Sequence, residues 1–250
     1  MSSYFLVLFF GFNSHFADLA IAINSQSPIL TQLALWQHPS LESEQSAYSV
    51  VQTTSHLENA LLLCAKIANL AFTPNAESYS TSEIWNGLYA QFQSIQSSQQ
   101  SDSLLPLLSS QIGSFAFSKP DSQPSTAYVP SEFPLHIHTS RVSFYSAFLT
   151  HFISILLLIS RPRNVERTMS SRLKTTTWHA VHVCGLSMSN NILWSTDPVV
   201  VAALLHAGPS LSYVAQQIEL LRHLRRLEKT TGWKFGGEVV QLEEFWRASS

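Results

Sequence analysis

The sequence contains few charged residues, which make up 12% of its 250 positions. Soluble domains typically carry about twice that share. The net charge is −2, and its sign differs between the two halves of the chain. Residues 1–140 hold two basic and nine acidic side chains, whereas residues 141–250 hold twelve basic and seven acidic ones. A basic excess this small favours neither extensive phosphate binding nor a histone-like role.

Cysteine and glycine are also scarce. Eight glycines are few for a sandwich or a barrel, which needs many tight turns. The two cysteines, Cys64 and Cys184, each lie in an apolar stretch with helical spacing, so we expect buried, reduced thiols rather than a disulfide. Two cysteines cannot form a four-cysteine zinc site, nor a six-cysteine zinc cluster.

Motifs of the common enzyme classes are absent as well. The chain has no glycine-rich phosphate loop, no hydrolase nucleophile elbow and no zinc-protease motif. Residues 185–189 (GLSMS) resemble an elbow, but the last residue is serine and the context is helical. The pairs His136/His138 and His179/His182 lack an Asp, Glu or Cys at ligand spacing on the same face, so neither predicts a zinc site. We therefore expect no catalytic, cofactor-binding or metal-binding residues, and no cofactor in this chain.

The apolar N-terminus raises the question of a membrane. Tyr4–Phe12 is apolar, but no Lys or Arg precedes it and no small-residue cleavage site is evident, so it does not resemble a signal peptide. A helix that continues through Asp18 would place there a charge costing about 2.5–3.5 kcal/mol at the centre of a bilayer. The apolar run Phe152–Ile159 is too short to span a bilayer. We expect a soluble protein that is not secreted, with membrane attachment through Met1–Asn24 as the alternative.

Helical spacing and helix-breaking residues predict a succession of helices. The expected helices are Tyr4–Ile23, Ser40–Phe72, one that opens at Ser80, Thr139–Arg161, Ser171–Asn190, Pro198–Ala207, Ser212–Thr231 and a last one around Val239–Trp246. Alternating strand patterns are nearly absent, and no internal repeat is found. The sequence therefore predicts an all-α fold of about seven to nine helices in a single domain, residues 1–250. Residues 99–138 hold five of the eleven prolines and many serines, which predicts a long flexible loop.

Particular side chains are expected to cap these helices or to face their core. Ser80 with Glu83 predicts a capping box, and Asp197 followed by a proline predicts an N-cap. Ile218 is expected to face the core together with the leucines of its helix. The basic residues of that helix are expected to form its solvated face, available to protein partners rather than to nucleic acid; they are Arg222, Arg225, Arg226 and Lys229.

A series of motifs in the last two thirds of the chain is more specific than its composition. These motifs are Ile84-Trp85-Asn86-Gly87-Leu88, Phe133-Pro134 before a helix with His151 and Leu156–Leu158, Trp178-His179-Ala180, Cys184-Gly185-Leu186-Ser187, Ser189-Asn190-Asn191, Trp194, and Leu227–Trp233 (LEKTTGW). Their order resembles the regulatory region of the fungal zinc-cluster (Zn2Cys6) transcription factors. In that family the blocks read LW..L, FP…YH…LLLL..RP, WHA…CGI…SN and LE..TGW. The resemblance spans Ser80 to Trp246.

The resemblance implies a helical, non-enzymatic regulatory domain of a transcription regulator that acts in the nucleus. It implies partners among the proteins of the transcription machinery or a related regulator, a small-molecule effector as a further candidate ligand, and DNA contact only through partners. The motif residues carried over are expected to be structural; they are Trp85, Trp178, His179, Cys184, Gly185, Asn190, Trp194, Gly232 and Trp233. We expect Trp178 and Trp233 to pack in the core, Gly185 to permit close approach of helices, and Gly232 to end a helix with a positive φ.

The chain also departs from the family pattern. It has no six-cysteine cluster, and the arginines that usually follow WHA are Val181 and His182 here. The Pro/Ser-rich loop is also longer than usual. DNA binding therefore cannot be carried over to any residue of this sequence. We interpret the chain either as a truncated relative or fragment of such a regulator, or as a regulator that acts through protein contacts alone. An unrecognised all-α enzyme is a third hypothesis, and no acid or base constellation in the sequence supports it.

Overall fold

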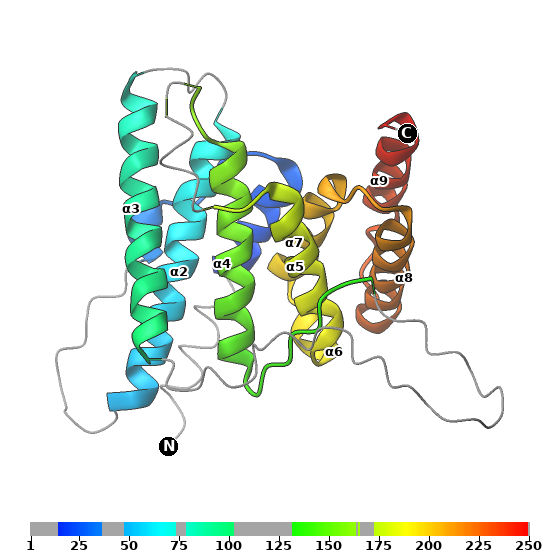
Figure 1. Cartoon of the computed structure of the whole chain (residues 1–250), viewed down its shortest axis with the longest axis horizontal. Helices are drawn as coiled ribbons and strands as arrows, with labels where there is room; N and C mark the ends of the chain where they lie inside the picture. The colour runs from blue at the N-terminus through cyan, green and yellow to red at the C-terminus, as the bar shows by residue number, and fades with distance from the viewer. Residues whose placement is uncertain are drawn as a thin grey trace, which may run out of the picture.

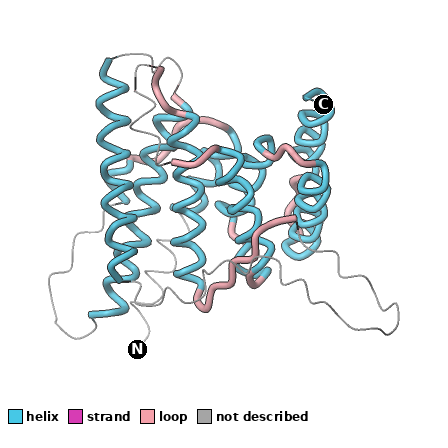
Figure 2. The backbone as a smooth tube through the Cα atoms, viewed as in Figure 1, coloured by secondary structure: helices cyan, strands magenta, loops and turns pink. Residues whose placement is uncertain are grey.

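The computed structural model describes residues 15–36, 48–73, 79–102, 132–163, 165 and 173–249. Every regular element in this part of the chain is a helix, and no strand occurs in it (Figure 2). After a helical stretch at residues 15–25, the elements are η1 (Leu33–Trp36), α2 (Tyr48–Phe72), α3 (Tyr79–Asp102), α4 (Arg141–Ile159), α5 (Thr176–Ser189), α6 (Ile192–Ser195), α7 (Pro198–Ala207), η2 (Gly208–Ser210), α8 (Val214–Thr231) and α9 (Gly236–Ser249). The predicted all-α fold is confirmed.

The helices are arranged across the molecule nearly in chain order, except that α2 lies between α3 and α4. The long helices α3, α2 and α4 lie side by side, α5 and α7 pack beyond α4, and the α8–α9 pair forms the opposite end (Figure 1). The buried apolar side chains form one cluster that runs from residues 15–25 to α9. Cys64 and Cys184 lie in this cluster as free thiols, as expected, and burial raises the pKa of both.

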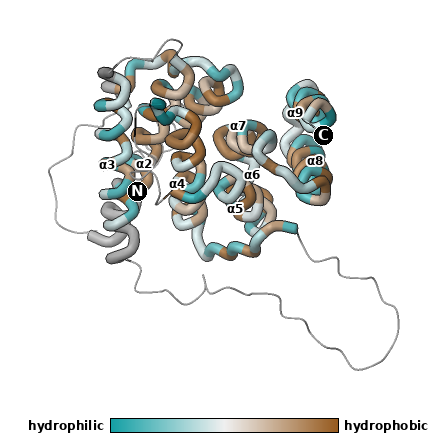
Figure 3. The backbone as a smooth tube through the Cα atoms, turned by 45° about the horizontal axis from the view of Figure 1, so that its top comes forward, coloured by the Kyte–Doolittle hydropathy of each residue, from teal (hydrophilic) through white to brown (hydrophobic). Residues whose placement is uncertain are grey.

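Helix α4 is the centre of the core. Ser140 is its N-cap and accepts a hydrogen bond from the backbone N–H of Ser143 at 3.1 Å. The predicted stripe of Phe144, Phe148, Phe152 and Ile155 is fully buried, and α4 and α7 are the most hydrophobic helices of Figure 3.

Helix α4 extends well beyond the apolar run at residues 152–159. That run alone is too short to span a bilayer, whereas the whole of α4 is long and apolar enough to do so. Ten of its residues are buried inside the protein, and core helices of globular proteins pass the same test of length and composition.

Several predicted helix boundaries need correction. Helix α3 includes Tyr79, one residue before the predicted start at Ser80, and the side chain of Ser80, on which the predicted capping box depends, lies outside the described part of the chain. Helix α5 begins at Thr176, capped by Thr175, rather than at Ser171, and α8 begins at Val214 rather than at Ser212.

Three further expectations fall partly outside the described residues. The helix predicted over Ser40–Phe72 is observed from Tyr48 to Phe72, and residues 37–47 lie outside the described part. The first predicted helix began at Tyr4, and residues 15–25 of it are helical, while residues 1–14 lie outside the described part. Of the predicted loop at residues 99–138, the first four residues belong to α3 and residues 132–138 form an extended segment. The rest, residues 103–131, lies outside the described residues.

Helices α8 and α9 are joined to the rest of the molecule through η2. A Cβ atom added at Gly208 would lie 2.8 Å from a methyl group of Leu242 on α9, so a larger residue at this position would require the Leu242 side chain to shift. Trp246 of α9 donates a hydrogen bond from Nε1 to the carbonyl oxygen of Gly208 at 3.1 Å. The leucines of α8 at positions 220, 224 and 227 are buried. Ile218 does not join them: it is 51% exposed, and the expectation that it faces the core is wrong.

Candidate functional site: a histidine cluster

Four histidines from three separate segments come together beside α5. His136 lies on the extended segment 132–138, His151 on α4, and His179 and His182 on α5. The ring centroids of His136 and His182 are 5.1 Å apart, those of His151 and His182 are 4.9 Å apart, and those of His151 and His179 are 5.3 Å apart. We call these four residues the histidine cluster.

The extended segment 132–138 brings His136 to this position. It runs from α8 to the start of α4 and crosses α5 on the way (Figure 1). In an extended chain successive side chains point to opposite sides, and here Leu135 and Ile137 are exposed while His136 is partly buried.

Gly185 of α5 and Asn190, the C-cap of α5, hold segment 132–138 close to the helix. The position of a Cβ atom at Gly185 would be 2.5 Å from the carbonyl oxygen of Pro134. Asn190 accepts a hydrogen bond from the backbone N–H of His138 at 2.8 Å and donates one to the carbonyl oxygen of His136 at 2.6 Å. Gly185 therefore permits close approach of an extended segment rather than of a helix, which corrects the sequence-based expectation.

Hydrogen bonds orient the rings of the cluster. The Nδ1 atoms of His151 and His179 are 3.0 Å apart, so one of them donates a proton to the other. His182 donates from Nδ1 to the carbonyl oxygen of Trp178 at 2.9 Å, since a carbonyl can only accept. The Nε2 atoms of His136 and His179 are buried and have no hydrogen-bond partner among the described residues.

Burial and mutual repulsion keep the cluster neutral at pH 7. Burial is the main cause that lowers the pKa of His151 to about 3 and those of His136 and His179 to about 4. The pKa of His182 is lowered by burial as well, and its hydrogen bond to Trp178 opposes this. Within the described part of the chain, the charges that act on these pKa values all come from histidines. A proton added to the cluster therefore meets no carboxylate to stabilise it.

Trp178 covers one side of the cluster. Its ring centroid lies 3.8 Å from that of His182 and 5.4 Å from that of His151. The side chain is nevertheless 39% exposed, so the expectation that it packs in the core is wrong. Its motif position places it at the edge of the molecule, where it separates the histidines from solvent.

The cluster is not arranged as a metal centre. Among the described residues, no group of three or more His, Cys, Asp or Glu is placed to hold a metal ion. Chemically, the arrangement places four imidazoles in one partly buried volume, where they stay neutral near pH 7 and would repel one another if protonated. Sequence reasoning treated the pairs 136/138 and 179/182 separately and did not connect His151 to either, since only the packing of α4 against α5 brings them together.

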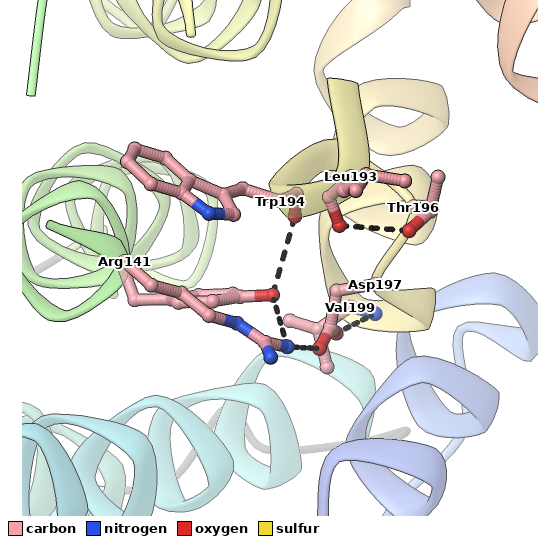
Figure 4. Close-up of polar contacts among 7 residues, drawn as sticks. Arg141, Leu193, Trp194, Thr196, Asp197 and Val199 are labelled. Atoms are coloured by element: carbon pink, nitrogen blue, oxygen red, sulfur yellow. Dashed lines mark hydrogen bonds and ion pairs between the residues drawn. The ribbon is translucent and has the colours of Figure 1, made fainter. Parts of the chain in front are cut away.

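A second polar group joins the start of α4 to the start of α7. Arg141 lies 3.6 Å from a carboxylate oxygen of Asp197 and donates a hydrogen bond to the hydroxyl of Tyr145 at 3.3 Å. That hydroxyl donates in turn to the carbonyl oxygen of Trp194 at 3.2 Å (Figure 4). Asp197 also accepts from the backbone N–H of Val199 at 3.0 Å, which makes it the predicted N-cap of α7. Each of these groups has a structural partner, so the arrangement holds helices together.

A serine and a histidine meet in the core as well. Ser187 of α5 and His223 of α8 form a hydrogen bond of 2.8 Å between Oγ and Nε2. Both side chains are buried, and burial is the main cause that lowers the pKa of His223 to about 4, with Arg226 contributing. Ser187 lies in the middle of α5 rather than on a strand-to-helix turn, so its position is that of a core hydrogen bond and not of a nucleophile elbow.

The other motif residues have structural positions with one exception. Trp85 is fully buried, Cys184 lies in the core, and Trp194 packs on Phe144 with ring centroids 5.7 Å apart. Gly232 has a φ of 74° and donates its N–H to the carbonyl oxygen of Glu228, as expected for a glycine that ends a helix. Trp233 is 39% exposed, so the expectation of a core position is wrong for this residue too.

Comparison with known proteins adds no relative: no protein-family model, no curated protein and no solved structure matches this chain.

Proposed function

We propose that this chain is the helical regulatory domain of a transcription regulator similar to the fungal zinc-cluster family. In this proposal it acts in the nucleus through contacts with other proteins and reaches DNA only through them. The observation that carries the proposal is that motifs far apart in the sequence contact one another in the fold.

Three contacts join these motifs in pairs. Trp85 of the LW..L block donates from Nε1 to the carbonyl oxygen of Leu157, in the leucine-rich block, at 3.0 Å. His151 of that same helix meets His179 of the WHA block. Pro134 of the FP block lies against Gly185 of the CG block. Motif residues that support one another in this way are expected of a shared scaffold.

The polar groups of the site give no support to an enzymatic role. Ser187 and His223 are both buried, and the carboxylate of Asp197 is occupied by the N-terminus of α7 and by Arg141. The membrane alternative gains no support from residues 15–24, because Phe16, Leu19 and Ile23 of this stretch pack in the protein core. A role in protein contacts fits these observations better than either alternative.

The exposed face of α8 is the surface we assign to a protein partner. Arg222, Arg226 and Lys229 are exposed on it, while Arg225 is held by Glu243 of α9 at 3.0 Å. The leucine face of the same helix is buried, so the basic side chains lie on the face that is turned to solvent. Their charge suits an acidic partner surface, and charge complementarity of this kind speeds association more than it strengthens it.

A reporter assay tests this proposal. The chain is fused to an unrelated DNA-binding domain in a fungal strain that carries the matching reporter gene, and reporter expression is compared with that of the DNA-binding domain alone. We expect the fusion to raise or lower expression, and the double variant Arg222→Glu, Lys229→Glu to lose most of this change. Lys174→Glu, which reverses an exposed charge before α5, is the matched control and should behave like the wild type.

Two results would contradict the proposal. Expression equal to that of the DNA-binding domain alone would argue against a regulatory role, provided that circular dichroism shows the fusion to be folded. Recovery of a defined motif by the isolated chain in a selection on random duplex DNA would contradict indirect DNA contact, because specific recognition needs side chains that reach base edges.

A further inference from the structure

The attachment of segment 132–138 to α5 depends on few groups. The side chain of Asn190 makes both hydrogen bonds between α5 and the backbone of His136 and His138. The ring of His136 lies between these bonds and inserts toward His151 and His182. Leu135 and Ile137 on either side of it are 57% and 63% exposed. After the buried Phe133, His136 is therefore the side chain that holds the middle of the segment in place.

The charge of the histidine cluster decides whether attachment of segment 132–138 to α5 is energetically favourable. With neutral rings, the histidines pack as partly apolar side chains and His151 and His179 share one proton between their Nδ1 atoms. With added protons, like charges would lie at ring distances of 4.9–6.5 Å. The titratable groups that face the rings are histidines on all three segments: His136 and His138, His151 of α4, and His179 and His182 of α5. No carboxylate of the described residues acts on them.

We infer that the histidine cluster is an acid-sensitive latch, which holds segment 132–138 on α5 when its rings are neutral and releases the segment when they are protonated. Histidine serves this purpose because its charge changes within the range of pH that cells and organelles reach. The inference concerns how the fold responds to pH and does not depend on the proposed function.

The segment is the part that moves, because the helices on either side are anchored independently. Helix α4 is fixed by buried side chains such as Phe148 and Leu156, and α5 by Val183 and Cys184. Segment 132–138 has no helical hydrogen bonds of its own. Its release from α5 breaks the two bonds to Asn190 and the 3.5 Å bond from the Ser189 hydroxyl to the carbonyl oxygen of Pro134, and it returns His136 to water. That movement hydrates the ring and separates it from the other three, which removes both causes of its low proton affinity.

Hydrogen exchange measured by mass spectrometry tests the latch on the full chain. Exchange of a peptide that covers residues 135–140 is followed at pH 7.0 and pH 5.0, with correction for the pH dependence of the intrinsic rate. The pKa of His136 is about 4 in the attached segment and about 6.5 in water. Protonation therefore makes the equilibrium constant for release about twentyfold larger at pH 5.0 than at pH 7.0. We expect the protection of this peptide to fall by about that factor, while peptides from α7 and α8 stay protected.

Two histidine variants separate the latch from a general effect of acid. His136→Gln keeps a polar side chain of similar reach but cannot be protonated, so protection of the segment should become nearly independent of pH. His206→Gln is the matched control: His206 of α7 is partly buried with a lowered pKa, but its ring packs on Phe72 and Phe152 outside the cluster. This control should keep the full effect of pH.

Several results would overturn the inference. These are equal protection of the wild-type segment at the two pH values, loss of protection in all helices together, and a His136→Gln variant that responds to pH like the wild type. Should His136→Gln fail to fold at pH 7.0 by circular dichroism, His182→Gln decides the matter, because His182 contributes to the low pKa of His136, His151 and His179. Its response to pH should be smaller than that of the wild type, and an unchanged response contradicts the latch.

Discussion

The tryptophans of this chain show that one residue type in similar motifs can have different roles. Trp85 is fully buried and its Nε1 is paired with a backbone carbonyl, so it is a core residue. Trp178 and Trp233 are both partly exposed, and Trp178 shields the histidine cluster. Tryptophan combines a large apolar ring with one polar N–H, which suits it to both places. Only its neighbours in the fold decide between them.

The close contact between Gly185 and Pro134 can be tested with a single substitution. Gly185→Ala would place a methyl group against the carbonyl oxygen of Pro134, and backbone cannot move aside as a flexible side chain can. We expect this variant to lose about 1–3 kcal/mol of the free energy of unfolding, as for overpacked sites in general. Urea denaturation followed by circular dichroism measures the change.

The control for this variant is Gly87→Ala. Gly87 lies within α3, and a Cβ atom added there would meet no described atom within 4 Å other than the neighbouring backbone of its own helix. The same substitution should therefore stabilise the protein by about 0.5–1 kcal/mol, because alanine favours a helix over glycine. Equal effects of the two variants would show that the contact between Pro134 and Gly185 does not limit the position of the segment.

At the level of elements, the join between α4 and α7 depends on one carboxylate. Asp197 caps α7 and faces Arg141 on the first turn of α4. Burial is the first cause that raises the pKa of Asp197, while its bond to the Val199 N–H, the Tyr145 hydroxyl and Arg141 act in the opposite direction. The side chain of Arg141 is 52% exposed, so its attraction for Asp197 is weakened by water. We infer that Asp197 matters chiefly as a cap and less as a charge.

Two substitutions separate these roles. Asp197→Ala removes the oxygen that accepts from the Val199 N–H, and it should destabilise the protein by about 0.5–2 kcal/mol. Asp197→Asn keeps an oxygen of equal capping ability but removes the charge, so it should cost clearly less. Thermal unfolding at neutral pH and moderate salt compares the two variants. An Asn variant as unstable as the Ala variant would mean that the ion pair, and not the cap, holds this join.

For the whole molecule, buried histidines predict a loss of stability in acid. His151 has a pKa of about 3 in the fold and about 6.5 in an unfolded chain. Above pH 6.5 the ring is neutral in both states and costs nothing. As the pH falls from about 6.5 toward 3, the unfolded chain gains a proton that the folded chain does not, so the free energy of unfolding declines by about 1.4 kcal/mol per pH unit for this residue.

Urea denaturation between pH 7 and pH 4 measures this decline. The free energy of unfolding of the wild type should fall with pH more steeply than that of His151→Gln, by about 1.4 kcal/mol per pH unit. Parallel curves would mean that His151 is protonated in the folded protein, with a proton affinity close to that of a free histidine.

Much of the fold could be predicted from local patterns. The stripe of aromatic residues on α4, the Asp197 cap before a proline and the stop at Gly232 follow from helical spacing and from backbone preferences that act within a few residues. The two buried thiols follow from the apolar stretches around them. These features depend on interactions between neighbours in the chain, which are present in the sequence itself.

The histidine cluster was decided by the tertiary structure alone. His136, His151 and His179 lie on three separate segments, and no local sequence pattern links their positions. Packing brings the rings of His136 and His182 close to that of His151, which forms a hydrogen bond with His179. The same holds for the exposure of Trp178, Trp233 and Ile218, because helical spacing shows which residues share a face but not whether another helix covers that face. Long-range packing sets the burial of each ring, and burial sets its charge.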